Sequence, residues 1–371
     1  MSQMKYNLTK QRMDKNYKMK CLNTILLLIA MLGLCSCNYS VTELDKKFSS
    51  GVVLIQNSCY YELVLPDGES LFFSNYSEKD GVEGLTTDED SIQPNIHYGT
   101  GFFISNDGKI VTNKHVVSAT VEETEAQQML NKLIKFIKSA TQEKYREYLS
   151  YLETKKKLML ESYLNDEYED YYDYKLIKET LEEEMEELSD TYDELEEIDY
   201  RDAKLIYHND VGVAYNNTYV TSVNDFKPCV IKQTGKDVDL AVIQLKDKQT
   251  PQGRHVFKIS ETDPLDKYRI GESIAKLFGS DKNEKVVMIG YNLGPILALT
   301  NEGVLSQHTE GTISQKNEDR IMYSIPALNG SSGSPILNLR GQIIAINYAG
   351  LQGTQNFNYG IRVQKLTDLL Y

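Results

Sequence analysis

The heptapeptide NGSSGSP at residues 329–335 combines serines with glycines and could present a nucleophilic hydroxyl group. A serine becomes an effective nucleophile only when a neighbouring base accepts its proton. Glycines at positions 330 and 333 would let the backbone turn tightly around Ser332. Runs of Gly and Ser are also typical of flexible linkers, so the stretch alone leaves a catalytic loop and a linker open.

A base for this serine must come from one of five histidines, which are His97, His115, His208, His255 and His308. None of them follows Ser332, which excludes the serine, acid, histidine order of the α/β-hydrolases. His115 lies in "GKIVTNKHVVSA", at the expected end of a strand after an Asp-Gly turn, where an imidazole can face a cleft. His97 is expected at the surface, and no motif surrounds the other three.

An acidic partner is expected at Asp239, in "KDVDLAVIQL", where a carboxylate at the start of an apolar strand can be half-buried. Such a carboxylate fixes the tautomer of the histidine and stabilises its positive form. Asp237 points to the same side of the strand and is an alternative. The order His115, Asp239, Ser332 along the chain is the one found in chymotrypsin.

Short segments rich in Val, Ile, Tyr and Phe, separated by Asp-Gly and Asn-Gly turns, predict a mainly β protein from Val52 onward. They include "VVLIQNSCYYELVL", "GTGFFISNDGKIVTNKHVV", "AKLIYHND", "VTSVNDF" and "PCVIKQTGKDVDLAVIQLK". Residues 38–51 are mostly polar and give no clear structural signal.

Residues 121–203 break this pattern and predict an inserted helical hairpin. Apolar or aromatic side chains recur there at steps of three or four residues in two runs. The runs are Leu130, Ile134, Ile137, Thr141, Tyr145, Tyr148, Leu152 and then Ile177, Leu181, Met185, Leu188, Tyr192, Leu195, Ile198. The stretch "LNDEYEDYYDY" between them is expected to form the turn of an antiparallel coiled coil.

The net charge of −14 is located in this insertion. Residues 121–203 hold 25 acidic and 11 basic side chains, whereas the rest of the chain holds 29 of each. No basic face is evident, so nucleic acid is not expected as a partner. The acidic helix face is expected to be solvated, with binding of a protein partner as the alternative.

Three blocks of the sequence resemble the catalytic blocks of trypsin-like serine proteases, closest to the bacterial HtrA-like branch. "GTGFFISNDGKIVTNKHVV", "DVDLAV" and "NGSSGSPILNLRGQIIAIN" are similar to the family patterns G-S-G-F-[IV]-I…T-N-x-H-V, D-[LIV]-A and G-N-S-G-[GS]-P. The resemblance covers residues 52–120 and 203–363. It departs from the family at Ser331, where Asn is usual. We also expect no PDZ domain after the third block, unlike in many HtrA-like enzymes.

The resemblance implies a mainly β fold of two six-stranded β-barrels with the helical hairpin as an insertion. We therefore expect a protease domain at residues 37–120 and 204–371, interrupted by the acidic hairpin at residues 121–203. His115 would be the general base and then the general acid, Asp239 its orienting partner and Ser332 the nucleophile.

Further site residues follow from the same resemblance. The backbone N–H groups of Gly330 and Ser332 would form the oxyanion hole. Among the three serines of the loop, only Ser332 has a glycine two residues before it and another just after it, as the family register requires.

The substrate is expected to be a protein or peptide that is cleaved after a small or medium apolar residue. The position that is acidic in trypsins, six residues before the nucleophile, is Pro326, and Ala327 follows it. Asn347, Tyr348 and Ala349 belong to a strand that would pair with the extended substrate backbone. The alternative function is an inactive, protease-like scaffold that presents the hairpin as an adaptor.

Residues 1–36 are expected to form a signal peptide. Lys15, Lys18 and Lys20 precede an apolar stretch of 13 residues from Leu22 to Leu34, which is too short to span a bilayer. The sequence Leu-Cys-Ser-Cys that ends at Cys37 resembles the bacterial lipoprotein box. It implies lipidation of Cys37 and an exported protein anchored in the cell envelope, facing the periplasm or the cell surface. A soluble secreted protein is the alternative.

Two cysteines of the expected mature chain, Cys59 and Cys229, could form a disulfide bond or stay as buried thiols. No spacing of Cys and His residues indicates a metal site, and no cofactor is expected.

Overall fold

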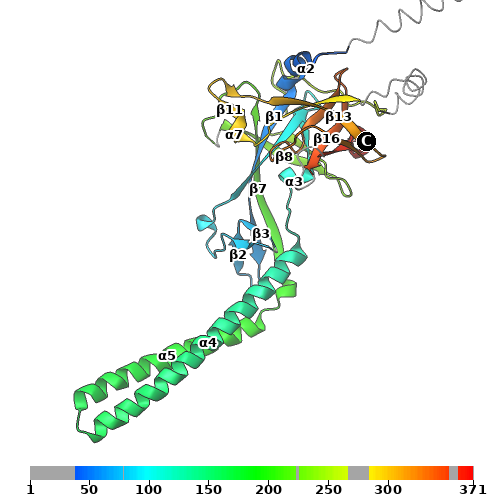
Figure 1. Ribbon diagram of the computed structural model, residues 1–371. Coiled ribbons are helices and arrows are strands. Elements are labelled where there is room, and N and C mark those ends of the chain that lie inside the picture. The colour runs from blue at the N-terminus through cyan, green and yellow to red at the C-terminus, as the bar shows by residue number, and fades with distance from the viewer. Residues whose placement is uncertain (1–37, 78, 223–224, 266–283, 351–357, 371) are drawn as a thin grey trace, which may run out of the picture. The chain divides into compact units, whose positions relative to one another are not determined.

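The computed structural model describes the greater part of the chain (Figure 1). The described residues are 38–77, 79–222, 225–265, 284–350 and 358–370. The expected signal peptide and the expected lipidation site Cys37 lie outside these ranges. Within them, no helix has the length and the apolar character that crossing a membrane requires.

Contacts divide the chain into two compact units. The first unit holds the described residues of Met1–Ile55, Tyr98–Lys114 and Val213–Tyr371, and the second holds Gln56–His97 and His115–Gly212. The division into a protease domain at residues 37–120 and 204–371 with an insertion at 121–203 stays a prediction.

Six strands of a seven-stranded sheet close into a first antiparallel barrel, in the order β1-β5-β6-β9-β8-β7, with β7 pairing back to β1 and β2 added beside β1. The strands are β1 (Val52–Val64), β2 (Ser70–Phe73), β5 (Asn95–Phe103), β6 (Lys109–Thr112), β7 (Lys204–Tyr215), β8 (Lys227–Thr234) and β9 (Ala241–Leu245). All five residues of β9 are buried, including the polar Gln244 within its otherwise apolar sequence.

The second barrel lies in the first unit and closes in the order β10-β13-β14-β17-β16-β15. Its strands are β10 (Lys285–Gly290), β13 (Gln307–Lys316), β14 (Arg320–Tyr323), β15 (Pro335–Asn338), β16 (Ile343–Gly350) and β17 (Asn358–Arg362). Buried apolar side chains from these strands, among them Met288, Tyr323 and Ile336, fill its interior. The expected mainly β fold with two six-stranded barrels is confirmed.

The expected helical hairpin is confirmed and consists of α4 (Glu123–Leu164) and α5 (Tyr168–Glu197) (Figure 1). The helices run antiparallel, because Lys138 pairs with Glu196 at 2.8 Å and Lys156 pairs with Glu182 at 3.2 Å. Its inner contacts form a small cluster of Leu152, Leu181 and Met185, flanked by Tyr148 and Ile177.

The start of α4 is anchored by a separate apolar cluster in the second unit. Met129, Leu130 and Ile134 of α4 pack there with Tyr61 of β1 and Phe73 of β2. One face of the first three turns of α4 is therefore buried against β1 and β2.

Helix α2 (Val41–Phe48) lies within residues 38–51, whose mostly polar sequence does not indicate a helix or a strand. Ser40 caps it by accepting a hydrogen bond from the backbone N–H of Glu43 at 3.3 Å, and the Glu43 carboxylate accepts from the Ser40 N–H at 2.8 Å. Leu44 and Phe48 are buried in the main core of the first unit.

The remaining short elements are α3 (Lys114–Val117), α7 (Pro295–Ala298), α8 (Val363–Leu370), β3 (Asn75–Ser77), β4 (Gly81–Glu83), β11 (Leu299–Thr300) and β12 (Gly303–Val304). Three 3₁₀ turns lie at Ser49–Gly51, Glu89–Ser91 and Tyr200–Asp202.

One expected β segment, "VTSVNDF" at residues 220–226, is not a strand among its described residues. The Asp225 carboxylate accepts hydrogen bonds from the backbone N–H groups of Thr221 at 2.7 Å and Ser222 at 2.9 Å. This local side-chain turn takes the donors that a strand ladder would need.

The two cysteines that were open to pairing are both buried as thiols, and the described part of the chain contains no disulfide bond between them. Burial raises the pKa of the Cys59 thiol. The Cys229 thiol donates to the carbonyl oxygen of Lys227 at 3.7 Å.

Candidate active site

The loop that carries Ser332 links β14 to β15 and is a tightly bent backbone rather than a linker. Gly330 and Gly333 adopt φ angles of +91° and +89°, which side chains disfavour. A Cβ atom on Gly333 would lie 2.1 Å from the carbonyl oxygen of Thr100, and one on Gly330 would lie 2.5 Å from the backbone nitrogen of Gly294. Both positions therefore need glycine for conformation and for space.

Thr100 of β5 holds this loop from one side. Its backbone N–H donates to the carbonyl oxygen of Ser332 at 2.8 Å, and its hydroxyl donates to the carbonyl oxygen of Gly330 at 2.8 Å. The Thr112 hydroxyl in turn donates to the Thr100 carbonyl at 2.7 Å. The sequence block "GTGFF" contains Thr100, but the sequence reasoning gave this residue no role.

Asn347 of β16 holds the same loop from another side. Its backbone N–H donates to Ser334 and its carbonyl accepts from Gly333, at 2.9 and 2.8 Å. Its buried side chain donates to the carbonyl oxygen of Ser331 at 2.9 Å and accepts from the Tyr323 hydroxyl. Asn347, which is expected to bind substrate, therefore supports the loop that carries Ser332.

The three serines of the loop differ in accessibility. Ser331 is 2% exposed and Ser334 is fully buried, whereas Ser332 is half-buried. The Ser331 hydroxyl is also engaged, because it donates to the carbonyl oxygen of Leu328 at 2.6 Å. Of these three hydroxyl groups, that of Ser332 is therefore the one a substrate can reach.

The backbone N–H groups of the loop separate into two sets. Those of Ser331, Gly333 and Ser334 donate to carbonyl oxygens of neighbouring residues. Among the described residues, no hydrogen bond from the N–H of Gly330 or of Ser332 is found. These two groups remain available to an external acceptor, and they are the pair expected to form the oxyanion hole.

Asp239 lies half-buried just before β9, whereas the alternative Asp237 is exposed. The fully buried side chain of Asn113 donates to the backbone carbonyl of Asp239 at 2.8 Å. A groove of about 830 Å³ in the first unit is lined by Asp237, Asp239 and Tyr348 among others. Sequence reasoning missed the contribution of Asn113.

His115 is exposed and lies on the one-turn helix α3, which directly follows β6, rather than at a strand end. Two asparagines of the second unit fix the end of this helix. Asn57 donates to the carbonyl oxygen of Val116, and Asn209 donates to that of Val117, each at 3.0 Å. His115 belongs to the second unit, and Asp239 and Ser332 belong to the first, so the meeting of the three side chains stays a prediction.

His97 is half-buried, contrary to its expected surface position. Burial lowers the pKa of His97, and the positive charge of protonated His115 lowers this pKa further. Both residues lie in the second unit. Both effects favour the neutral form of His97.

The remaining histidines have structural contacts. His208 lies 2.7 Å from the Glu62 carboxylate and stacks on Tyr60, and His308 lies 3.5 Å from Asp45. His255 packs edge-on between two phenylalanines of the core.

The other residues expected at the substrate site lie before the Ser332 loop or on β16. Pro326 is exposed, and Ala327 is half-buried against the core of the second barrel. Tyr348 is half-buried beside a β-bulge, and Ala349 pairs with Tyr359. Within the described residues, no group of His, Cys, Asp and Glu side chains could hold a metal ion.

Comparison with known proteins shows similarity to proteases. The sequence pattern of the trypsin-like peptidase domain matches residues 196–346, which include Asp239 and Ser332 and begin after His115. Together with the two closed barrels, this match supports a trypsin-like serine protease.

Two solved structures are similar to the chain. The serine endoprotease from Yersinia pestis has 13% identity and a TM-score of 0.40, with 90% of this chain and 66% of that chain covered. A protease from M. tuberculosis in its active form has 12% identity and a TM-score of 0.40, with 88% and 82% covered. The match thus extends over 66% of the length of the Yersinia protein.

Proposed function

We propose that the protein is a serine endopeptidase in which His115, Asp239 and Ser332 form the catalytic triad. The observation that carries this proposal is the nucleophile loop. It buries two of its serines, leaves Ser332 accessible, and leaves the N–H groups of Gly330 and Ser332 without an acceptor among the described residues. A linker has no physical reason to fix its backbone in this way.

The proposed reaction proceeds through an acyl-enzyme. The Ser332 hydroxyl oxygen attacks the substrate carbonyl carbon while His115 accepts its proton, and Asp239 stabilises the imidazolium. The N–H groups of Gly330 and Ser332 bind the oxyanion that forms. The C–N bond then breaks, His115 gives its proton to the leaving amine, and water releases the acyl group from Ser332 by the reverse sequence of steps.

The substrate is proposed to be a protein or peptide with a small or medium apolar residue before the scissile bond. Pro326 and Ala327 carry no charge that would select Lys or Arg. The backbone of Tyr348 and Ala349 is proposed to pair with the substrate strand. The groove of about 830 Å³ that Tyr348 and Asp239 both line is proposed to receive substrate side chains on the acyl side of that bond.

The protein is further proposed to be exported and anchored in the bacterial cell envelope by a lipid on Cys37. The support for this proposal is the sequence of residues 22–37. Metabolic labelling with a radioactive fatty acid tests it. Label should be incorporated into the wild type and be absent from Cys37→Ala, and equal labelling of the two would contradict lipidation at this site.

Digestion of an unfolded protein, with the fragments sequenced by mass spectrometry, tests the proposed function. Wild type is expected to cut denatured casein after Ala, Val or Leu, and Ser332→Ala is expected to leave it intact. Absence of cleavage by folded wild type would favour the inactive scaffold that displays its hairpin. Cleavage mainly after Lys or Arg would refute the proposed specificity.

A further inference from the structure

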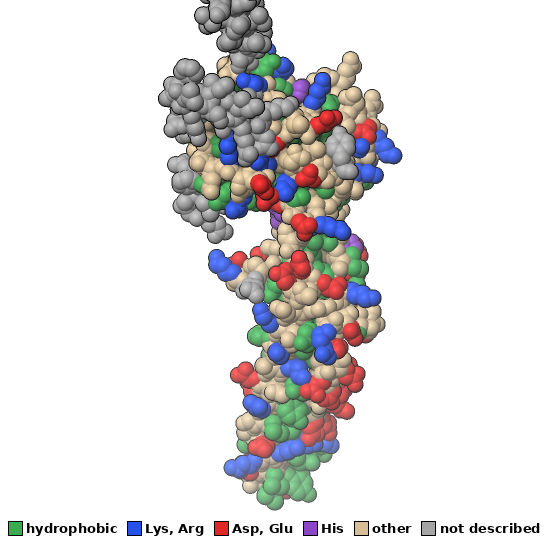
Figure 2. All heavy atoms as spheres, turned by 90° about the vertical axis from the view of Figure 1, so that its right-hand side faces the viewer, with side chains coloured by type: hydrophobic (Ala, Val, Ile, Leu, Met, Phe, Trp, Pro, Cys, Tyr) green, Lys and Arg blue, Asp and Glu red, His purple; other side chains and the backbone are tan. Residues whose placement is uncertain are grey.

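The end of the helical hairpin exposes large apolar and aromatic side chains where solvated helices usually carry polar ones. Between residues 160 and 176, six such side chains are 52–70% exposed. These residues, which we call the tip cluster, are Leu160, Tyr163, Leu164, Tyr168, Tyr172 and Leu176. Figure 2 shows hydrophobic side chains gathered at this end of the hairpin. A cluster of six large, exposed apolar or aromatic side chains indicates a binding surface.

The packing between α4 and α5 does not bury these side chains. Its seam is filled by Leu152, Leu181 and Met185, which are 5–7% exposed, whereas Leu164 at the tip is 70% exposed. The ring contacts of the tip tyrosines are local, with Tyr163 edge-on to Tyr168 at 6.4 Å between ring centroids and Tyr172 edge-on to Tyr171 at 5.4 Å. Removing the tip cluster from water would therefore require a second molecule.

The same segment carries a strong negative charge. Residues 160–176 contain six carboxylates and one lysine, a net charge of −5. Of these carboxylates, only Glu161 forms an ion pair among the described residues, with Lys157 at 3.9 Å. The Asp166 carboxylate accepts a hydrogen bond from the Tyr168 hydroxyl at 2.9 Å. The acidic groups are thus interleaved with the tip cluster, and most of them have no cationic partner among the described residues.

We propose that the tip cluster docks a partner protein whose binding face presents Arg or Lys side chains around an apolar centre. Charge complementarity favours this occupant. Arginine pairs with carboxylates through two hydrogen bonds and stacks on tyrosine rings, and the exposed leucines would contact the apolar centre. A second copy of the chain would bring two sets of six carboxylates together, and anionic lipid headgroups would also be repelled.

Fluorescence anisotropy of the full chain with synthetic peptides tests the proposal. The probe is a fluorescein-labelled, 14-residue amphipathic peptide of Arg, Leu and Ala, and its reference has Glu in place of Arg. Wild type should bind the Arg peptide at least about tenfold more tightly than the Glu peptide. The triple variant Leu164→Ser/Tyr172→Ser/Leu176→Ser should weaken that binding by about tenfold or more, as loss of central anchors does.

Matched variants separate the tip from the rest of the hairpin. Phe136→Ser removes a side chain on α4 that is 71% exposed and lies outside the tip, and it should leave binding within about twofold of wild type. Neutralising four tip carboxylates (D166N, E167Q, E169Q, D170N) should weaken binding by about tenfold. Neutralising four carboxylates farther along α5, outside the tip (E183Q, E184Q, E186Q, E187Q), should weaken binding far less. Circular dichroism verifies that every variant keeps its helices.

Several results would overturn the proposal. Equal binding of the Arg and Glu peptides would show that the tip cluster is not the docking surface. Equal losses of affinity in the tip and control variants would show the same. Sedimentation that shows a dimer of wild type, abolished by the triple variant, would assign the surface to a second copy. Binding to phosphatidylglycerol vesicles but not to the Arg peptide would assign it to a membrane.

Discussion

At the scale of single residues, buried amides hold the three parts of the candidate site in place. Asn57, Asn113 and Asn347 are 0–2% exposed, and each donates a side-chain hydrogen bond to a backbone carbonyl. These carbonyls belong to Val116, Asp239 and Ser331, each of which is an expected triad residue or its neighbour in sequence. A neutral amide fixes a backbone without adding charge that would shift the pKa of a catalytic group.

Replacing Asn113 with Ala should therefore impair catalysis without removing a group that touches substrate. The change leaves the Asp239 carbonyl without its 2.8 Å hydrogen bond and frees the segment that carries the expected acid. We expect kcat to fall by about 10- to 100-fold with little change in KM, because misplacement mainly raises the barrier to reaction. Steady-state kinetics with a peptide substrate measure both constants.

Asn216→Ala is the matched control, since Asn216 is 3% exposed and its side chain accepts a hydrogen bond from the Ser306 N–H at 2.9 Å. Both variants should lose about 1–3 kcal/mol of unfolding free energy. Equal kinetics for the two variants would contradict a positioning role for Asn113.

His255 should make the protein less stable in mild acid. Burial lowers its pKa below the ordinary value of 6.5, and the positive charge of Lys47 lowers that pKa further. As the pH falls below about 6.5, the unfolded chain takes up a proton that folded His255 resists, so the unfolding free energy decreases. Denaturant titrations at pH 7.5 and 5.5 should show a smaller decrease for His255→Phe than for wild type, and identical decreases would refute this role.

Sequence reasoning at this scale could name His115, Asp239 and Ser332 as candidates because catalysis needs particular functional groups at recognisable spacings. It could not find Thr100 or Asn113. Their hydrogen bonds go to backbone carbonyls of residues that are distant in sequence, and every residue type offers such a carbonyl. Only the folded chain specifies which carbonyl each side chain meets.

At the scale of elements, the loop that carries Ser332 depends on Gly330 and Gly333, because neighbouring backbone atoms of Tyr291, Gly294 and Thr100 leave no room for a side chain. Gly333→Ala would place a Cβ atom 2.1 Å from the Thr100 carbonyl at a φ of +89°. We expect a loss of about 2–4 kcal/mol of unfolding free energy, from strain and overpacking together. Gly253→Ala has a similar φ of +83° with no atom within 4 Å, so it should lose only about 1 kcal/mol. Equal losses in denaturant titrations would show that the loop is not sterically constrained.

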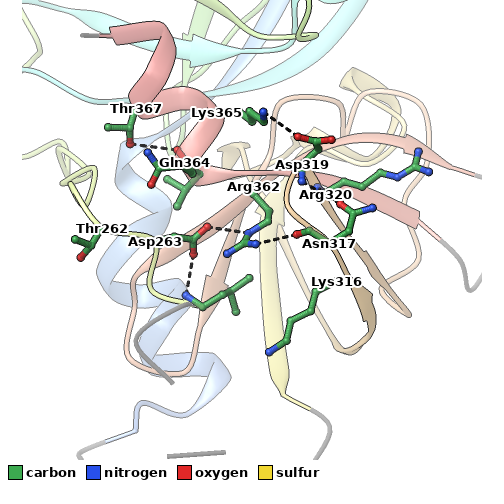
Figure 3. A network of polar contacts seen from close by, with 12 residues as sticks. Thr262, Asp263, Lys316, Asn317, Asp319, Arg320, Arg362, Gln364, Lys365 and Thr367 are labelled. Atoms are coloured by element: carbon green, nitrogen blue, oxygen red, sulfur yellow. Dashed lines mark hydrogen bonds and ion pairs between the residues drawn. The ribbon is translucent and has the colours of Figure 1, made fainter. Parts of the chain in front are cut away.

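A buried ion pair fixes the end of β17 next to α8. Figure 3 shows Arg362 between Asp263 and Asn317, with its Nε donating to the Asp263 carboxylate at 2.9 Å and Nη1 to the Asn317 carbonyl at 2.8 Å. The side chains of the pair are 8% and 0% exposed. Replacing Asp263 would therefore leave a buried positive charge without its main counter-ion.

Asp263→Asn is expected to lower the unfolding free energy by about 3 kcal/mol or more. The nearby pair of Lys365 and Asp319, at 2.8 Å, provides the control because it is exposed to solvent. Asp319→Asn should leave the unfolding free energy almost unchanged, since water replaces a surface partner. Similar midpoints for both variants in a denaturant titration would contradict a structural role for the buried pair.

The elements differ in how well the sequence predicts them. A long three- and four-residue periodicity predicts the helical hairpin, and a short run that is apolar except for Gln244 predicts β9. Helix α2 has too few apolar residues for such a signal, and its evidence in sequence is the pair Ser40 and Glu43, which forms the capping box. The "VTSVNDF" segment has strand-forming residue types, but hydrogen bonds to Asp225 outweigh that preference.

At the scale of the whole molecule, charge and chemistry are divided between different parts of the sequence. The net charge of −14 lies in residues 121–203, and the expected triad lies outside that segment. The two barrels could be predicted because their residue blocks resemble a known family. The tip cluster could not, because the periodicity that predicts a buried seam does not show which of the remaining leucines and tyrosines stay exposed.

The central claim is that Ser332 is activated by His115 as the nucleophile of a peptidase. Labelling of the folded protein with a fluorophosphonate, followed by mapping of the modified peptide, tests it most directly. We predict one label per chain on Ser332, no label in Ser332→Ala, labelling at least about 100-fold slower in His115→Ala, and normal labelling in His308→Ala. Folded wild type that takes no label, or takes it equally in Ser332→Ala, would contradict the account.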